Sequence, residues 1–162
     1  MGPILRVYID TSVIGGCLEE RWQDDSLKLM ELFAGGKMRP VLSSLTIDEV
    51  LAAPRAEVRA LLDRPELKNA EKVKLADISE ADALAEAYIQ EGVVTQNSMT
   101  DAQHIAAATV LRVNVLVSWN FRHIVNLRRI HLFNAVNLKR GYPMLDIRSP
   151  KEVVGYEDLE GF

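Results

Sequence analysis

Short apolar runs alternate along this chain with segments whose apolar residues recur every three or four positions, which predicts strands that alternate with helices. The segment from Ser98 to Phe121 shows both patterns in succession. Its first part is apolar on nearly every side of a helical wheel, which predicts a buried helix. Its second part is a run of β-branched and aliphatic residues around Val115, typical of a parallel strand that is buried on both faces.

Applied along the whole chain, the two periods predict a series of elements. Strands are predicted at 4–9, 40–43, 73–78, 113–117 and 144–147. Helices are predicted at 24–34, from Ser44 or Thr46 to Pro54, at 55–62, 80–91, 98–111 and 121–129, and from Ser149 onward. The chain also turns from strand into helix after Asp10, and Gly15–Gly16 is expected to loosen or break that helix.

Strands that alternate with helices predict a single α/β domain with a mainly parallel sheet. With 162 residues the chain is long enough to bury its own core, and it shows no internal repeat or linker. We expect the domain to occupy residues 1–154 and residues 155–162 to form a frayed tail.

Composition excludes several classes of protein. The apolar fraction of 48% and the charged fraction of 26% are ordinary for a soluble protein, and no apolar run is long enough to cross a membrane. The single cysteine, Cys17, excludes an intramolecular disulfide and is interpreted as a small buried side chain rather than a nucleophile. Because the N-terminus also lacks the layout of a signal peptide, a cytoplasmic protein is expected.

The net charge of −4 is unevenly distributed along the chain. Residues 102–145 contain no Asp or Glu but several Arg and Lys, which predicts a locally basic surface suited to phosphate groups. A solvated surface that lacks acids explains the charge equally well. The candidate phosphate contacts are Arg122, Arg128 and Arg129, for which a role on a helix surface is the alternative.

Four polar residues are expected to converge at one edge of the sheet. Asp10 and Asn120 follow predicted strands, whereas Glu49 and Asp101 lie on the first turns of predicted helices. The carboxyl ends of parallel strands share one edge, and ligands of open α/β sheets bind outside it. The sequence therefore predicts a polar site there.

Helix capping is the competing interpretation for each of the three acids. Thr46–Glu49 and Ser98–Asp101 fit capping boxes, and Asp10 is able to cap the helix that follows it. Capping does not explain why acids recur at one edge, where their charges repel one another unless a cation lies among them. Oxygen ligands of this kind suit Mg²⁺ or Mn²⁺.

Several segments resemble a single family in both order and spacing: IDTSV (9–13), TIDEVL (46–51), TDAQHIAAAT (100–109), LVSWNFRHIVN (116–126) and RSPKEV (148–153). The family is that of the PIN-domain ribonucleases, and the chain looks most like the VapC-like toxins of type II toxin–antitoxin pairs. The resemblance implies a three-layer α/β/α sandwich around a parallel sheet, and hydrolysis of RNA with Mg²⁺ or Mn²⁺ as cofactor.

The resemblance also implies which residues form the site. The family's metal-binding acids and the hydroxyls of its pocket fall on Asp10, Glu49 and Asp101, and on Thr11, Ser12 and Ser118. Asn120 stands where many members have a fourth acid. Its amide is able to ligate a metal or orient a water molecule, but it brings no charge to a second metal site.

Three further side chains near these motifs have competing interpretations. His104 and His123 are candidate general acids, but His104 lies within the apolar helix and is interpreted as a hydrogen-bonded core histidine. Trp119 is interpreted as a packing residue rather than a platform for a nucleobase.

The function predicted from the resemblance is that of a metal-dependent endoribonuclease toxin, which would bind a small antitoxin and form a homodimer as its relatives do. Two alternatives stay open. One is a degenerate PIN module that binds RNA or a protein partner without cleavage, which Asn120 favours. The other is a phosphotransfer enzyme built on Asp10, which lacks the acid two residues further on because Ser12 stands there.

Overall fold

The computed structural model describes residues 3–159, and its centre is a five-stranded sheet in which neighbouring strands are parallel. The strand order is β3-β2-β1-β4-β5. The strands are β1 (Leu5–Ile9), β2 (Met38–Ser43), β3 (Glu71–Val73), β4 (Val115–Val117) and β5 (Asp146–Arg148).

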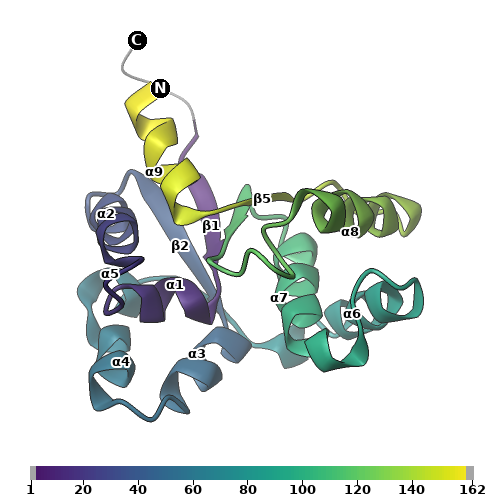
Figure 1. Ribbon diagram of the computed structural model, residues 1–162, viewed down its shortest axis with the longest axis horizontal. Helices are drawn as coiled ribbons and strands as arrows, with labels where there is room; N and C mark the ends of the chain where they lie inside the picture. Colours follow the sequence, from purple (N-terminus) through teal and green to yellow (C-terminus); the bar gives the residue numbers. More distant parts are fainter. Residues whose placement is uncertain (1–2, 160–162) are drawn as a thin grey trace.

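Helices cover both faces of the sheet (Figure 1). Those on one side are α1 (Thr11–Gly16), α2 (Gln23–Ala34), α3 (Ser44–Leu51), α4 (Ala56–Ala60), α5 (Pro65–Lys68) and α9 (Pro150–Leu159), and those on the other are α6 (Glu80–Gln90), α7 (Met99–Val110) and α8 (Leu127–Lys139). Short 3₁₀ turns lie at Leu61–Asp63, Leu75–Asp77 and Gln96–Ser98. The predicted three-layer α/β/α fold with a parallel sheet is confirmed.

Alternation along the central strands gives each face its own hydrophobic core. Val7 and Ile9 of β1 belong to the cluster that includes α1 and α2, whereas Tyr8 belongs to the cluster that includes α6 and α7. Cys17 is buried in the first cluster, and burial raises the pKa of its thiol to about 11, which agrees with a packing role. No helix within residues 3–159 is long and apolar enough to span a bilayer.

Two predicted elements are wrong in position. The third strand lies at Glu71–Val73 rather than 73–78, because Leu75–Asp77 forms a 3₁₀ turn whose Leu75 N–H donates to Ser44 Oγ at 3.0 Å. The helix predicted at 121–129 begins only at Leu127 and continues to Lys139. Asn126 fixes that start, since its Oδ1 accepts a hydrogen bond from Arg129 N at 3.2 Å.

The final helix begins after Ser149, as predicted. Ser149 Oγ accepts from Glu152 N at 3.3 Å while Glu152 Oε1 accepts from Ser149 N at 3.2 Å, so the two residues form a reciprocal cap. α9 continues to Leu159, past residue 154 where the sequence places the end of the domain. The rest of the predicted tail, residues 160–162, lies outside the described residues.

The order of the strands locates the place where a ligand would bind. From β1 the chain proceeds outward to β2 and β3, then returns to the other side of β1 for β4 and β5. This reversal makes the gap between the ends of β1 and β4 a topological switch point, at which open α/β sheets bind ligands. Ile9 pairs with Val117 in the register, so Asp10 and Ser118 emerge together at that gap.

The two adjacent glycines of α1, Gly15 and Gly16, differ in how closely the surrounding residues approach them. A Cβ on Gly16 would lie 2.7 Å from Ser26 Oγ and 2.8 Å from Trp119 Nε1, whereas a Cβ on Gly15 would meet nothing within 4 Å. We expect Gly16→Ala to lower the free energy of unfolding by about 1–3 kcal/mol through overpacking. Gly15→Ala is the matched control and should be neutral or stabilising by up to about 1 kcal/mol. Urea unfolding of both variants measures the difference, and equal stabilities would contradict this account of the packing.

Candidate active site

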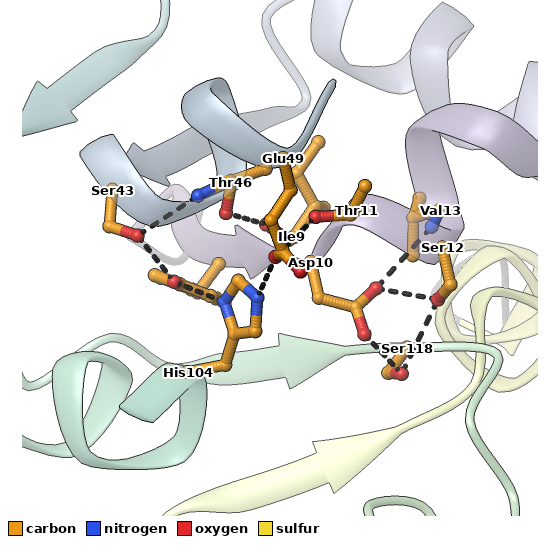
Figure 2. Close-up of polar contacts among 11 residues, drawn as sticks. Ile9, Asp10, Thr11, Ser12, Val13, Ser43, Thr46, Glu49, His104 and Ser118 are labelled. Carbon is orange, nitrogen blue, oxygen red and sulfur yellow. Dashed lines mark hydrogen bonds and ion pairs between the residues drawn. The ribbon is translucent and has the colours of Figure 1, made fainter. Parts of the chain in front are cut away.

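Asp10 is buried at the switch point with both carboxylate oxygens engaged (Figure 2). Its Oδ1 accepts from Ser12 Oγ at 2.6 Å and from Val13 N at 3.3 Å, and its Oδ2 accepts from Ser118 Oγ at 2.6 Å. The bond from Val13 N is the N-cap of α1, so the capping interpretation of Asp10 is correct. Capping and membership of the site are compatible roles for this residue.

Burial raises the pKa of Asp10 above its ordinary value, because the charged form loses hydration. The charge of His104 and the hydrogen bonds from Ser118 and Ser12 act in the opposite direction without cancelling that effect. An ionised Asp10 is therefore costly in the folded protein, and a cation beside it would relieve the cost.

Glu49 is held from two sides by hydrogen bonds to one carboxylate oxygen. Thr11 Oγ1 and His104 Nε2 both donate to Glu49 Oε1 at 2.7 Å (Figure 2). Partial burial raises the pKa of Glu49, but the bonds from His104 and Thr11 outweigh it and leave the pKa below its ordinary value. Glu49 is therefore an ionised acceptor near neutral pH.

The structure changes where Glu49 lies on its helix. Ser43 is the N-cap of α3 and accepts from Thr46 N at 3.5 Å, so the predicted capping box at Thr46–Glu49 is wrong. Glu49 lies on the second turn of α3 instead of the first. From there its side chain points to the switch point, and Ser43 rather than Glu49 caps the helix.

A buried chain of hydrogen bonds runs from Glu49 into the core (Figure 2). His104 is 3% exposed, and its Nδ1 lies 2.7 Å from Tyr8 OH, which in turn lies 2.7 Å from Ser43 Oγ. Because an ionised Glu49 only accepts, His104 Nε2 donates to it, and in the neutral imidazole Nδ1 accepts from Tyr8. Both ring nitrogens of His104 are engaged, which agrees with the interpretation of a hydrogen-bonded core histidine.

Sequence reasoning missed Tyr8 and Ser43 as parts of this chain. The available signal was a hydroxyl next to apolar residues: Tyr8 stands between Val7 and Ile9, and Ser43 ends β2 after Leu42. A buried hydroxyl needs a partner, but periodicity alone does not say which residue supplies it.

Asp101 lies on the first turn of α7 and, like Asp10 and Glu49, interacts with the charge of His104. The side chain of Ser98, the N-cap, makes no capping hydrogen bond, so the predicted capping box at Ser98–Asp101 is wrong as well. Burial raises the pKa of Asp101; the charges of His123 and His104 lower it, and those of Asp10 and Glu49 raise it further. The three acids therefore interact electrostatically at one place, although they come from three different elements.

Asn120 and His123 belong to the turn that follows β4. Asn120 Oδ1 accepts from the backbone N–H groups of Arg122 at 3.2 Å and His123 at 3.0 Å, while its own N–H donates to Ser118 Oγ at 2.9 Å. The amide that replaces the expected acid thus shapes the turn 121–126. Within residues 3–159, His123 Nδ1 is the buried side-chain nitrogen or oxygen that has no hydrogen-bond partner.

Trp119 is buried and packs beside the site, as its packing interpretation expects. Its ring stacks on Trp22 with 4.2 Å between centroids, and its Nε1 donates to Ser26 Oγ at 2.8 Å. The backbone N–H of Trp119 donates to Ser12 Oγ at 2.9 Å. This contact fixes the hydroxyl that in turn holds Asp10.

The carboxylate oxygens at this site suit a divalent cation that keeps most of its waters better than a cation that is surrounded by protein ligands. Among the residues that the structure describes, no three His, Cys, Asp or Glu side chains come close enough together to hold a metal ion jointly. Mg²⁺ usually keeps several waters and binds through one or two carboxylates. Asp10 and Asp101, which interact electrostatically, would supply that number of carboxylates.

The parallel sheet, its strand order and its two helical layers define an α/β/α fold of PIN type. No protein-family model and no curated protein sequence matches this chain. The solved structures that match its fold include VapBC2 from Rickettsia felis bound to a DNA fragment from their promoter, and FitAcB from Neisseria gonorrhoeae. Both are toxin–antitoxin complexes with PIN-domain toxins, so the fold expected from the resemblance is confirmed.

The two matches extend over nearly the whole chain despite low identity. VapBC2 has 17% identity and a TM-score of 0.58, and the match covers 90% of this chain and 98% of that one. FitAcB has 13% identity and a TM-score of 0.57, with 89% and 97% covered. At such identities the likeness concerns the fold alone.

The raised pKa of Asp10 predicts how stability depends on pH. The folded chain binds this proton more tightly than the unfolded chain, so the free energy of unfolding falls as pH rises through the interval between the two pKa values, and stays lower above it. Asp10→Asn removes the ionisable group. In buffer without divalent metal, we expect the variant to be more stable than the wild type at pH 7.

Urea unfolding between about pH 4 and about pH 8 measures this effect. Asp48→Asn is the control, because Asp48 is exposed and lies on α3, the helix that also carries Glu49. A variant at Asp10 that is less stable than the wild type at neutral pH would show that the buried carboxylate is not destabilising.

Proposed function

We propose that this protein is a divalent-metal-dependent endoribonuclease and acts in the cytoplasm as the toxin of a toxin–antitoxin pair. The proposal is supported by a fold shared with toxin–antitoxin complexes, and by the electrostatic interaction of Asp101 with Asp10 and Glu49. Two desolvated carboxylates beside an ionised one suit a cation and a phosphodiester better than they suit an apolar ligand.

Asp10 and Asp101 are the proposed metal-binding residues, with Glu49 acting through water. Mg²⁺ or Mn²⁺ held there would supply positive charge for the phosphate oxygens and a lower pKa for the attacking water. Ser12 and Ser118 hold the two oxygens of Asp10 at fixed positions.

Glu49 is the proposed acceptor of the water's proton. Its lowered pKa keeps it ionised, and the bonds from Thr11 and His104 leave Glu49 Oε2 free to accept from a water molecule. Of the two histidines considered as general acids, His123 is the one with an unengaged ring nitrogen, and it lies beside Asp101. Asn120 contributes by shaping the turn that carries His123.

An antitoxin and a second copy of the chain are the proposed protein partners. The two structures with the same fold are both complexes, and the one from Rickettsia felis was solved with promoter DNA. Leu127 and Leu138 of α8 are 73% and 57% exposed, which offers apolar contact area to a partner.

The test of the proposed function is a cleavage assay on single-stranded RNA with Mg²⁺ or Mn²⁺. We expect cleavage by the wild type that a chelator abolishes, and a loss of at least about 100-fold in Asp10→Asn and Asp101→Asn. Asp48→Asn, which changes an exposed acid next to Glu49 in sequence, should cleave as the wild type does. Wild-type rates in the Asp10 and Asp101 variants would refute the assignment of the site. A wild type that binds RNA but never cuts it would support the non-catalytic alternative.

A further inference from the structure

A second polar hollow, distinct from the acidic site, lies where the start of α8 meets the segment after α6. Its volume is about 320 Å³, and its lining includes Arg122, Arg128 and Arg129 together with Asn126 and the backbone of Gly92–Val93. No acidic residue lines it. Three guanidinium groups therefore share one concave surface with nothing of opposite charge on its walls.

The three arginines differ in how they are held. Arg129 is anchored, because its guanidinium donates to the carbonyl oxygen of Val93 and so joins α8 to the segment after α6. The guanidinium groups of Arg122 and Arg128 make no hydrogen bond or ion pair with any residue in the described part of the chain, residues 3–159. By contrast, Arg148 pairs with Asp146 and Glu152. Arg122 and Arg128 are thus available to an external anion.

The start of α8 strengthens the positive potential of the hollow. Arg128 and Arg129 lie in the first turn of this helix, which contains no acid. The N-terminus of a helix is itself the positive end of its dipole, so cations placed there are disfavoured. The arrangement costs free energy in the free protein, and a bound anion would recover it.

The hollow is connected to the acidic site by a single short turn. Asn120 folds the start of residues 121–126 by accepting from the backbone of Arg122 and His123, and Asn126 caps α8 at the other end. Between them lies His123, which interacts electrostatically with Asp101. A nucleic acid strand that crosses the acids would therefore reach the arginines next.

We propose that this arginine pocket binds a phosphate group of the RNA strand other than the one that is cleaved. The inference rests on the proposed function, because it takes the same strand to run through both sites. Arg122 and Arg128 contact the phosphate, for which the planar guanidinium offers paired donors, and Arg129 is a positioning residue that holds the wall of the pocket. The pocket would strengthen RNA binding and fix the position of the strand relative to the acidic site, without taking part in bond cleavage.

The test measures binding rather than cleavage, in the Asp10→Asn background so that RNA is not consumed. The probe is a fluorescently labelled single-stranded RNA of about 12 nucleotides, titrated by anisotropy over a series of salt concentrations. Adding Arg122→Gln and Arg128→Gln should weaken binding about tenfold at low salt. It should also reduce the slope of log K against log salt by about 0.7, the value for one phosphate contact to a single strand.

The matched control adds Lys28→Gln and Arg39→Gln to the same background. These two side chains are exposed on α2 and β2, and removing them changes the net charge by the same amount. Equal losses in both sets of variants, or no loss in either, would overturn the pocket. If the pocket variants alone lose affinity while the wild type never cleaves RNA, the binding inference survives and the nuclease proposal fails.

Discussion

Asp10 directly follows the central strand β1 and is only 5% exposed, so its carboxylate must replace nearly all of its hydration with protein contacts. The hydroxyls of Ser12 and Ser118 and the N–H of Val13 supply those contacts. Ser12 and Val13 belong to the first turn of α1, which follows β1, and Ser118 directly follows β4. The geometry of the switch point is thus fixed by the need to satisfy one buried acid. What the hydrogen bonds leave uncompensated is the charge itself, and the proposed cation site rests on that charge.

The three acids do not share one environment, and the difference separates their roles. Burial raises the pKa values of Asp10 and Asp101, whereas the bonds from His104 and Thr11 lower that of Glu49. Such a difference in pKa is what the proposed division between metal-binding acids and a proton acceptor requires. Glu49 is held by a buried chain of hydrogen bonds that runs through His104 to the hydroxyls of Tyr8 and Ser43. The packed interior therefore maintains the difference between Glu49 and the two aspartates, because each side chain in the chain orients the next.

The turn 121–126 joins the acidic site to the arginine pocket. Asn120 sits where the family resemblance leads one to expect an acid, and its side-chain oxygen is used by the backbone of the turn. An amide is suited to that task, since it satisfies two N–H groups without adding a charge. The positive charges of the pocket and the negative charges at the switch point are thus kept apart by a neutral residue that shapes the segment between them.

Sequence alone determined the parallel α/β fold and the edge at which Asp10, Glu49 and Asp101 meet, because the periods of apolar residues and the position of strand ends are local properties. It failed where partners are distant in sequence. The capping boxes at Glu49 and Asp101 were plausible locally, but the cap of α3 belongs to Ser43, and Ser98 makes no capping bond. Only the tertiary structure decided that His104 holds Glu49, because that bond requires α7 and α3, which lie on opposite faces of the sheet, to approach each other at its edge. Hydrogen bonds across 55 residues leave no trace in a periodic pattern.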